Sequence, residues 1–245
     1  MANNIPETGS KGRYTGRQYN SSFFVKITTE QQAYWLGYIR AAGYLVPSKT
    51  TVGITVTTQD KDHLVKLAHA TGLDASAIKT YRPTKHYKGW LIQDRARLLF
   101  SRKEFYQSFV DLGYCNRRAS YEEFPPLPEH LLRHFIRGMF DGSGIVGIED
   151  LEGKRRATAH CKWEISLHNE VMAVSLQRTL EQAIRQPLSL GRDHDIWAIR
   201  ETNQPTLRLL YQYLYDGATV WLQRKRLKFE EALQEKYGDN AKPAA

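Results

Sequence analysis

The first half of the chain opens with a helical pattern of apolar residues and then changes to a strand pattern. Thr29 and Gln32 have the spacing of a capping box, and the apolar run behind them predicts a helix that ends at Gly43. The segment 51–58 then alternates between aliphatic residues and threonine, which sends the two kinds of side chain to opposite faces. This alternation predicts a strand with one buried face.

Further elements follow in the same half. The stretch 60–70 is amphipathic and predicts a second helix. Residues 78–82 and 90–100 predict a pair of strands, and residues 102–112 predict a third helix.

The second half repeats this order of elements. Residues 128–141 predict a helix with proline in its first turn, and Gly142-Ser-Gly144 ends it as Gly43 ends the first helix. Residues 158–168 alternate like the first strand, and residues 170–184 predict the helix that follows. A duplicated unit of helices and strands is therefore expected, in the α+β class.

Shorter echoes accompany this repeat. Trp197-Ala-Ile199 is similar to Trp90-Leu-Ile92, and Tyr211-Gln212 is similar to Tyr106-Gln107. We interpret each echo as a position shared by the two copies.

The repeat divides the chain into three parts. Residues 1–22 lack apolar periodicity and predict a basic, flexible arm. Residues 23–122 form the first repeat, and residues 123–245 form the second repeat with a basic C-terminal helix.

Charge narrows the class of partner. The chain has 35 Lys and Arg against 26 Asp and Glu, a formal net charge of +9, and a pI near 9.5. Such a balance favours a polyanion through counterion release, although a membrane surface or an acidic protein would also fit.

Other features bear on the compartment. The two cysteines, Cys115 and Cys161, have no metal-ligand or disulfide spacing, and no apolar run is long enough to cross a membrane. We therefore expect a soluble, cytoplasmic protein, at a bacterial nucleoid or its organellar equivalent.

Two segments resemble the motif of the LAGLIDADG homing endonucleases. They are Ala33-Tyr-Trp-Leu-Gly-Tyr-Ile-Arg-Ala-Ala-Gly-Tyr-Leu45 and Phe135-Ile-Arg-Gly-Met-Phe-Asp-Gly-Ser-Gly-Ile-Val146. The segments 124–134 and 214–225 also resemble the family, so the resemblance covers both halves of the chain.

The resemblance implies two pseudo-symmetric αββαββα repeats, whose antiparallel sheets form a saddle around two central motif helices. Gly37 and Gly138 would allow these helices to approach closely. Gly43 and Gly144 would provide the backbone freedom to leave each helix. Because both halves lie in one chain, the resemblance also implies a monomer.

The chain departs from the family at its catalytic acids. The positions before each final glycine hold Ala42 and Ser143, which provide no carboxylate for a divalent metal. Two residues earlier stand Arg40, which suits a phosphate, and Asp141, a possible residual acid. We expect no catalytic residue, metal or cofactor, with Mg²⁺ needed only if the protein cuts DNA.

In the family each sheet lies in the major groove of double-stranded DNA. Alternation places hydrogen-bonding side chains on the corresponding faces here. With Arg40, the candidate DNA-binding residues are Thr55, Thr57, Gln93, Arg95, Arg97, His160, Lys162, Glu164, Ser166, His168 and Arg200.

The sequence therefore predicts a sequence-specific double-stranded DNA-binding protein that has lost cleavage and acts as a transcriptional regulator. WhiA-like bacterial regulators, which retain a degenerate LAGLIDADG domain, provide a family precedent. Two alternatives stay open: an active or nicking homing endonuclease, and an intron maturase that binds RNA through the arm and the basic run 222–228.

Overall fold

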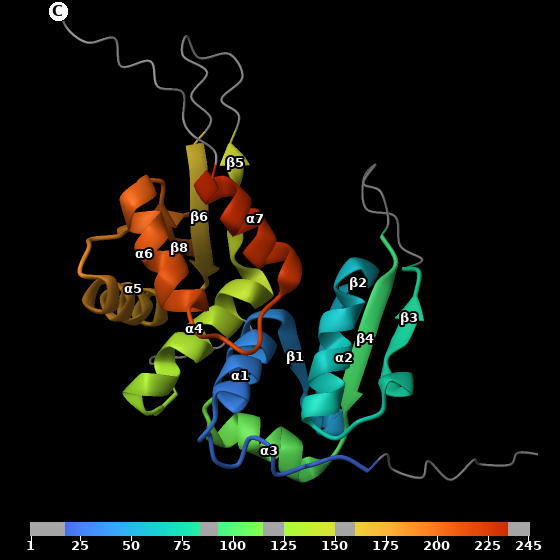
Figure 1. Cartoon of the computed structure of the whole chain (residues 1–245). Helices are drawn as coiled ribbons and strands as arrows, with labels where there is room; N and C mark the ends of the chain where they lie inside the picture. The colour runs from blue at the N-terminus through green and yellow to red at the C-terminus, as the bar shows by residue number, and fades with distance from the viewer. Residues whose placement is uncertain (1–17, 84–92, 115–124, 150–159, 235–245) are drawn as a thin grey trace, which may run out of the picture.

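A computed structural model describes residues 18–83, 93–114, 125–149 and 160–234 of the chain. The helices and strands form two consecutive sets, each with one sheet and its own helices (Figure 1). The first set comprises α1 (Glu30–Ala42), β1 (Gly43–Val46), β2 (Thr51–Thr57), α2 (Lys61–Ala70), β3 (Lys79–Tyr81), β4 (Arg95–Phe100) and α3 (Lys103–Asp111). The second set comprises α4 (Glu129–Ser143), β5 (Ile145–Glu149), β6 (His160–Leu167), α5 (Glu170–Ile184), β7 (Ser189–Asp193), β8 (Ile196–Glu201), α6 (Gln204–Tyr215) and α7 (Gln223–Gln234).

The two sheets have the same topology, which confirms the predicted repeat. The strand orders are β1-β2-β4-β3 and β5-β6-β8-β7, with every neighbouring pair antiparallel. In the first sheet, Gly53 of β2 pairs with Tyr44 on one side and with Leu99 on the other. In the second sheet, Glu164 of β6 holds the equivalent position and pairs with Ile145 and with Arg200.

This register corrects one of the sequence echoes. Because Arg200 corresponds to Leu99, Trp197 corresponds to Ala96 and not to Trp90. Residues 90–92 lie outside the described residues, and β4 begins at Arg95. Tyr106 and Tyr211 do lie in corresponding helices, α3 and α6.

The motif helices begin and end close to the predicted positions. In α1 the Thr29 side chain accepts from the backbone N–H of Gln32, and the Gln32 side chain completes the capping box. Pro128 is the N-cap of α4, and the helix continues to Ser143, beyond the predicted end at Asp141.

The two motif helices touch through their backbones where they cross (Figure 1). A Cβ atom on Gly37 would lie 2.0 Å from the carbonyl oxygen of Phe135. A Cβ atom on Gly138 would lie 2.0 Å from the carbonyl oxygen of Tyr34. Both glycines are therefore required for close approach, as the sequence predicts.

The glycines at the helix ends are required for a different reason from the predicted one. Gly43 has φ −89° and Gly144 has φ −66°, so both adopt extended backbone open to any residue. A Cβ atom would instead lie 2.4 Å from the Ile39 carbonyl oxygen at Gly43 and 2.2 Å from the Phe140 ring at Gly144. The missing side chain provides space here, not conformational freedom.

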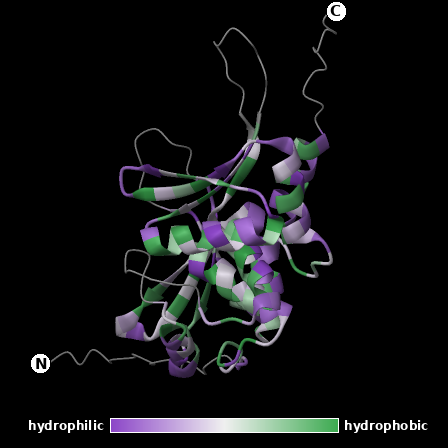
Figure 2. Ribbon diagram, turned by 90° about the vertical axis from the view of Figure 1, so that its left-hand side faces the viewer, coloured by the Kyte–Doolittle hydropathy of each residue, from purple (hydrophilic) through white to green (hydrophobic). Residues whose placement is uncertain are grey.

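Each sheet turns one face toward the helices and one face outward. The inward residues of β2 are the aliphatic ones that its alternation predicts, and Val52 and Ile54 are completely buried, as is Leu98 on β4. In β6, Trp163 and Ile165 are equally buried, and the Trp163 ring stacks on Phe140 of α4. Figure 2 shows the two sheets with the crossing helices between them.

The described end of the predicted arm is packed. The Tyr19 ring contacts Phe100 and Phe105 edge to face, and its hydroxyl accepts from the backbone N–H of Arg102. Packed structure therefore begins before residue 23, and residues 1–17 lie outside the described part of the chain. None of the helices in the described segments has the length and apolar character needed to cross a membrane.

Candidate nucleic-acid interface

The outer face of the first sheet carries two rows of polar side chains. Thr55 pairs with Arg97 across β2 and β4, and Thr57 pairs with Arg95. All four are partly exposed, and Gln93 is exposed just before β4. The Arg97 guanidinium lies 5.3 Å from the centre of the Tyr81 ring on β3. Neither Arg95 nor Arg97 has an acidic partner within the described residues.

The outer face of the second sheet carries a cluster of paired charges. The Glu164 carboxylate accepts from Arg200 at 2.8 Å and from Ser166 at 2.8 Å, and Lys162 lies 3.1 Å away. Burial alone raises the pKa of Glu164, but these three groups hold the pKa below its ordinary value. Glu164 lies on this outer face, as the alternation predicts, but it is only 7% exposed because its partners cover the carboxylate. The exposed His168 stands beyond β6, and the side chain of His160 lies outside the described residues.

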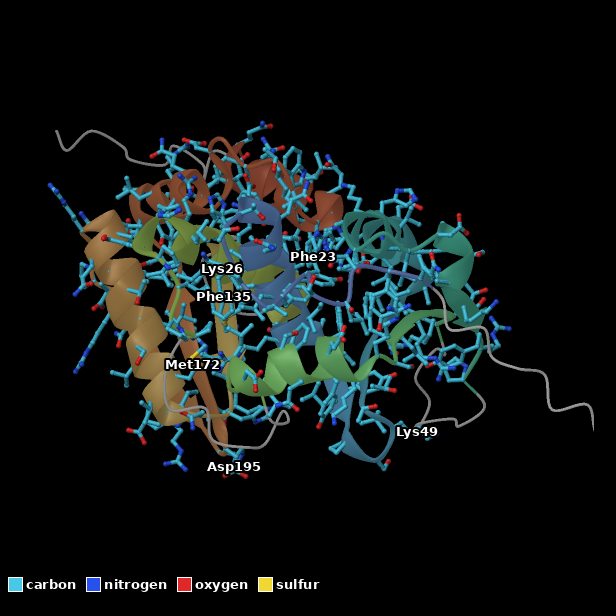
Figure 3. The ribbon with its side chains drawn as sticks, turned by 90° about the horizontal axis from the view of Figure 1, so that it is seen from below. Phe23, Lys26, Lys49, Phe135, Met172 and Asp195 are labelled. Carbon is cyan, nitrogen blue, oxygen red and sulfur yellow. The ribbon has the colours of Figure 1, made fainter. Side chains whose placement is uncertain are left out.

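Arg40, the candidate phosphate-binding residue of the first motif, lies in the last turn of α1 against the second repeat. Its guanidinium lies 5.9 Å from the centre of the Phe135 ring and 3.7 Å from the Met172 sulfur. Phe135 and Met172 lie close together in Figure 3, on α4 and α5 of the second repeat. Since α1 crosses between the repeats, its last turn points Arg40 toward the second repeat.

A cavity of about 460 Å³ opens where both motif helices end. Ala42 and Ser143 line it together, so the structure unites the two positions that hold acids in the family. Thr55, Thr57 and Arg95 join them from the first sheet. Three basic residues of α7, which the sequence did not single out as site residues, complete one wall: Arg224, Lys225 and Lys228.

Asp141 is held inside the protein by three donors. The hydroxyls of Tyr34 and Tyr215 each donate to its carboxylate at 2.7 Å, and so does the backbone N–H of Leu222. His63 lies 2.8 Å from the same Tyr34 hydroxyl. Burial raises the pKa of the Asp141 carboxyl, and Lys225 and these donors oppose the rise. Both oxygens of the predicted residual acid therefore accept hydrogen bonds that join α4 to α1, to α6 and to the segment before α7.

Lys225 caps the end of α4. Its ammonium donates to the carbonyl oxygens of Phe140 at 2.5 Å and of Asp141 at 2.8 Å. A cation suits the negative end of a helix, where carbonyl groups lack helical partners. Burial lowers the pKa of Lys225 to about 8, and Asp141 opposes this shift. Beside it, Arg224 forms two hydrogen bonds, of 3.0 and 2.9 Å, with Asp60 in the first repeat.

These side chains do not fit the divalent metals that the LAGLIDADG fold implies. Magnesium requires several oxygen ligands, carboxylates above all. Ala42 has no polar atom, and both oxygens of Asp60 and of Asp141 already accept hydrogen bonds. An ammonium occupies the helix-end carbonyls, and the described residues contain no cluster of three or more His, Cys, Asp or Glu suited to a metal.

The sequence held one signal for the basic wall. The segment 214–225, which resembles the family, ends at Lys225, and the basic run 222–228 includes all three residues. Neither pattern shows that Lys225 is buried, because its partners lie 84 and 85 residues earlier in the chain.

Comparisons with known proteins give no match to a family model and none to a curated protein. Solved structures do match. The homing endonuclease I-WcaI, bound to its DNA recognition sequence, is 16% identical with a TM-score of 0.53, over 85% of this chain and 90% of that one. The LAGLIDADG homing endonuclease I-LtrWI, bound to target DNA, is 9% identical with a TM-score of 0.54, over 84% and 90%.

A third solved structure also matches. Full-length DUF199/WhiA from Thermatoga maritima is 14% identical with a TM-score of 0.52, over 90% of this chain and 67% of that one. At such low identities the likeness establishes the fold. The chain therefore has the LAGLIDADG fold that its two motifs predict, with both repeats in a single polypeptide.

Proposed function

We propose that this protein binds double-stranded DNA sequence-specifically and does not cut it. One observation carries the proposal: both sheets have outer faces rich in hydrogen-bonding groups, and the pocket at the ends of the two motif helices, the helix-end pocket, is lined by no free carboxylate. In the two endonuclease structures that share the fold, the protein is bound to DNA. A net charge of +9 supports a polyanionic partner.

The pocket supports loss of cleavage. Hydrolysis of a phosphodiester at neutral pH by metal ions requires metal-bound hydroxide and neutralisation of the developing charge. Ala42 and Ser143 provide no anionic ligand, and Asp141 is committed to Tyr34, Tyr215 and Leu222. We therefore place the protein among binders, acting as a monomer and as a transcriptional regulator.

The test is a binding-site selection from random duplexes, followed by a cleavage assay on the selected site in magnesium and in manganese. We expect an enriched site, strongly salt-dependent affinity and intact DNA. Site-specific double-strand cleavage that Asp141→Asn abolishes would overturn the non-catalytic proposal. Preference for a folded intron RNA over every duplex would favour the maturase alternative.

The monomer has its own test. Solution mass without DNA should be near 28.3 kDa, because one chain supplies both repeats. A mass twice as large would contradict this part of the proposal.

A further inference from the structure

The helix-end pocket combines a basic wall with a floor of small residues. Arg95 comes from the first sheet, and Arg224, Lys225 and Lys228 come from α7. Ala42 and Gly142 leave the floor without bulky side chains. The two acids at this site, Asp60 and Asp141, each accept hydrogen bonds through both carboxylate oxygens. The pocket is thus electropositive and accessible, and its volume of about 460 Å³ accommodates a phosphate group.

Lys225 is the buried cation of this pocket. The residue is 7% exposed, and its ammonium uses two donors on the carbonyl oxygens of Phe140 and Asp141. An ammonium has three donors, of which these carbonyl oxygens use two, and Lys225 also lines the pocket. The Asp141 carboxylate holds the start of α7 in place, because it accepts a hydrogen bond from the backbone N–H of Leu222 just before this helix.

We propose that this pocket is a metal-independent seat for one phosphodiester of bound DNA, in which the Lys225 ammonium supplies positive charge in place of a metal. This inference rests on the proposed function and deepens it. In the fold's endonucleases a carboxylate at the helix end would repel a phosphate unless metals intervened. Ala42 removes that carboxylate, and the positive charge here is part of the chain.

The experiment measures binding of a fluorescein-labelled mixed-sequence duplex by anisotropy in EDTA, over a series of salt concentrations. The wild-type protein should bind as tightly in EDTA as in magnesium of equal ionic strength. Ala42→Asp should weaken binding in EDTA by about tenfold or more, because it returns a carboxylate to the phosphate seat. The exposed Gln182→Glu variant on α5 makes the same change in charge and should have little effect.

A second variant removes the internal cation. Lys225→Met should lower the salt slope by about 0.9, the value of one phosphate contact. Because Lys225 is buried, its circular dichroism and urea midpoint are measured first. If Lys225→Met does not fold, Ala42→Asp, which changes a partly exposed residue, decides alone.

The outcomes separate this inference from the proposed function. Duplex binding that neither variant weakens would overturn the phosphate seat and leave DNA binding intact. Binding that requires magnesium would also overturn it. If the wild-type protein binds no duplex, the proposed function fails, and the anion site is tested separately with inorganic pyrophosphate in EDTA. A rise in the melting temperature with pyrophosphate that Ala42→Asp removes would support the anion site. If pyrophosphate leaves the melting temperature of the wild-type protein unchanged, the anion site is overturned as well.

Discussion

The outer faces of the two sheets occupy the same place in the two repeats but differ in charge. On the first sheet, Arg95 and Arg97 stand beside threonines without an acidic partner among the described residues. On the second, Glu164 binds Arg200 and Lys162 and neutralises part of their charge. The apolar inner faces are meanwhile alike, since the first sheet packs on α1 and the second packs on α4, the two crossing helices. The two repeats therefore share the apolar pattern that folds them, whereas their polar faces differ in charge.

The motif helices show the same divergence at their ends. Arg40 and Asp141 occupy equivalent motif positions, yet Arg40 contacts Phe135 and Met172 across the repeat boundary. Asp141 is instead the centre of a buried hydrogen-bond network. We therefore expect the first repeat to anchor DNA and the second to hold α7 in place.

The largest effect is expected on stability, from a substitution at Asp141 compared with one at Arg40. Asp141→Ala should lower the free energy of unfolding by about 3 to 5 kcal/mol, because three buried donors and Lys225 lose their partner. Arg40→Ala should cost about 1 kcal/mol, since Arg40 is partly exposed and its contacts include a ring and a sulfur atom rather than a buried carboxylate. Urea denaturation at neutral pH measures both. Equal losses would show that the two helix ends are equivalent after all.

The two repeats are alike at the glycines where the motif helices cross, so substitutions there should have equal effects on stability. Gly37→Ala and Gly138→Ala should each cost about 2 to 3 kcal/mol, since the new methyl group meets backbone that cannot move aside. Gly147→Ala is the control, because a Cβ atom there has nothing within 4 Å. A difference above about 1 kcal/mol between the two crossing variants would contradict the symmetry of the crossing.

Local patterns predicted what depends on local physics. The capping box at Thr29, the strand 51–57 and the helix 170–184 are confirmed because their apolar periods and caps are encoded by neighbouring residues. The close approach at Gly37 and Gly138 followed from the motif resemblance.

The features that the sequence did not predict come from contacts between distant segments. Glu164 is buried because Arg200, on a strand that pairs with β6, folds over it. Arg40 points toward the second repeat because the helices cross, which its own sequence window cannot reveal. Gly43 requires space beside Ile39 and Gly53, a constraint set by packing and not by its dihedral angles.

A smaller effect concerns DNA binding by the first sheet. Arg97→Ala should weaken duplex binding by about 1 to 3 kcal/mol if it reads a base, or lower the salt slope by about 0.9 if it contacts a phosphate. Lys66→Ala removes the same charge from an exposed site on α2, which packs on the sheet's other side (Figure 1), and is the control. The double variant Glu164→Gln/Arg200→Gln removes one charge of each sign from the second sheet and should change affinity less. A larger loss in this double variant would reverse the assignment of the anchoring repeat.

The smallest effect on DNA binding is expected from Glu164, whose carboxylate distinguishes the second sheet from the first. Glu164→Gln should tighten duplex binding by a few-fold, because it removes a negative charge facing DNA and releases Arg200 and Lys162 toward phosphates. Each cation that then contacts a phosphate should steepen the salt slope by about 0.9. Asp62→Asn on α2 is the control with the same change in charge, and titrations at several salt concentrations separate slope from affinity. A weaker complex with an unchanged slope would mean that Glu164 accepts a hydrogen bond from a base, as a carboxylate does from cytosine N4, and that the paired cluster reads sequence rather than restraining its cations.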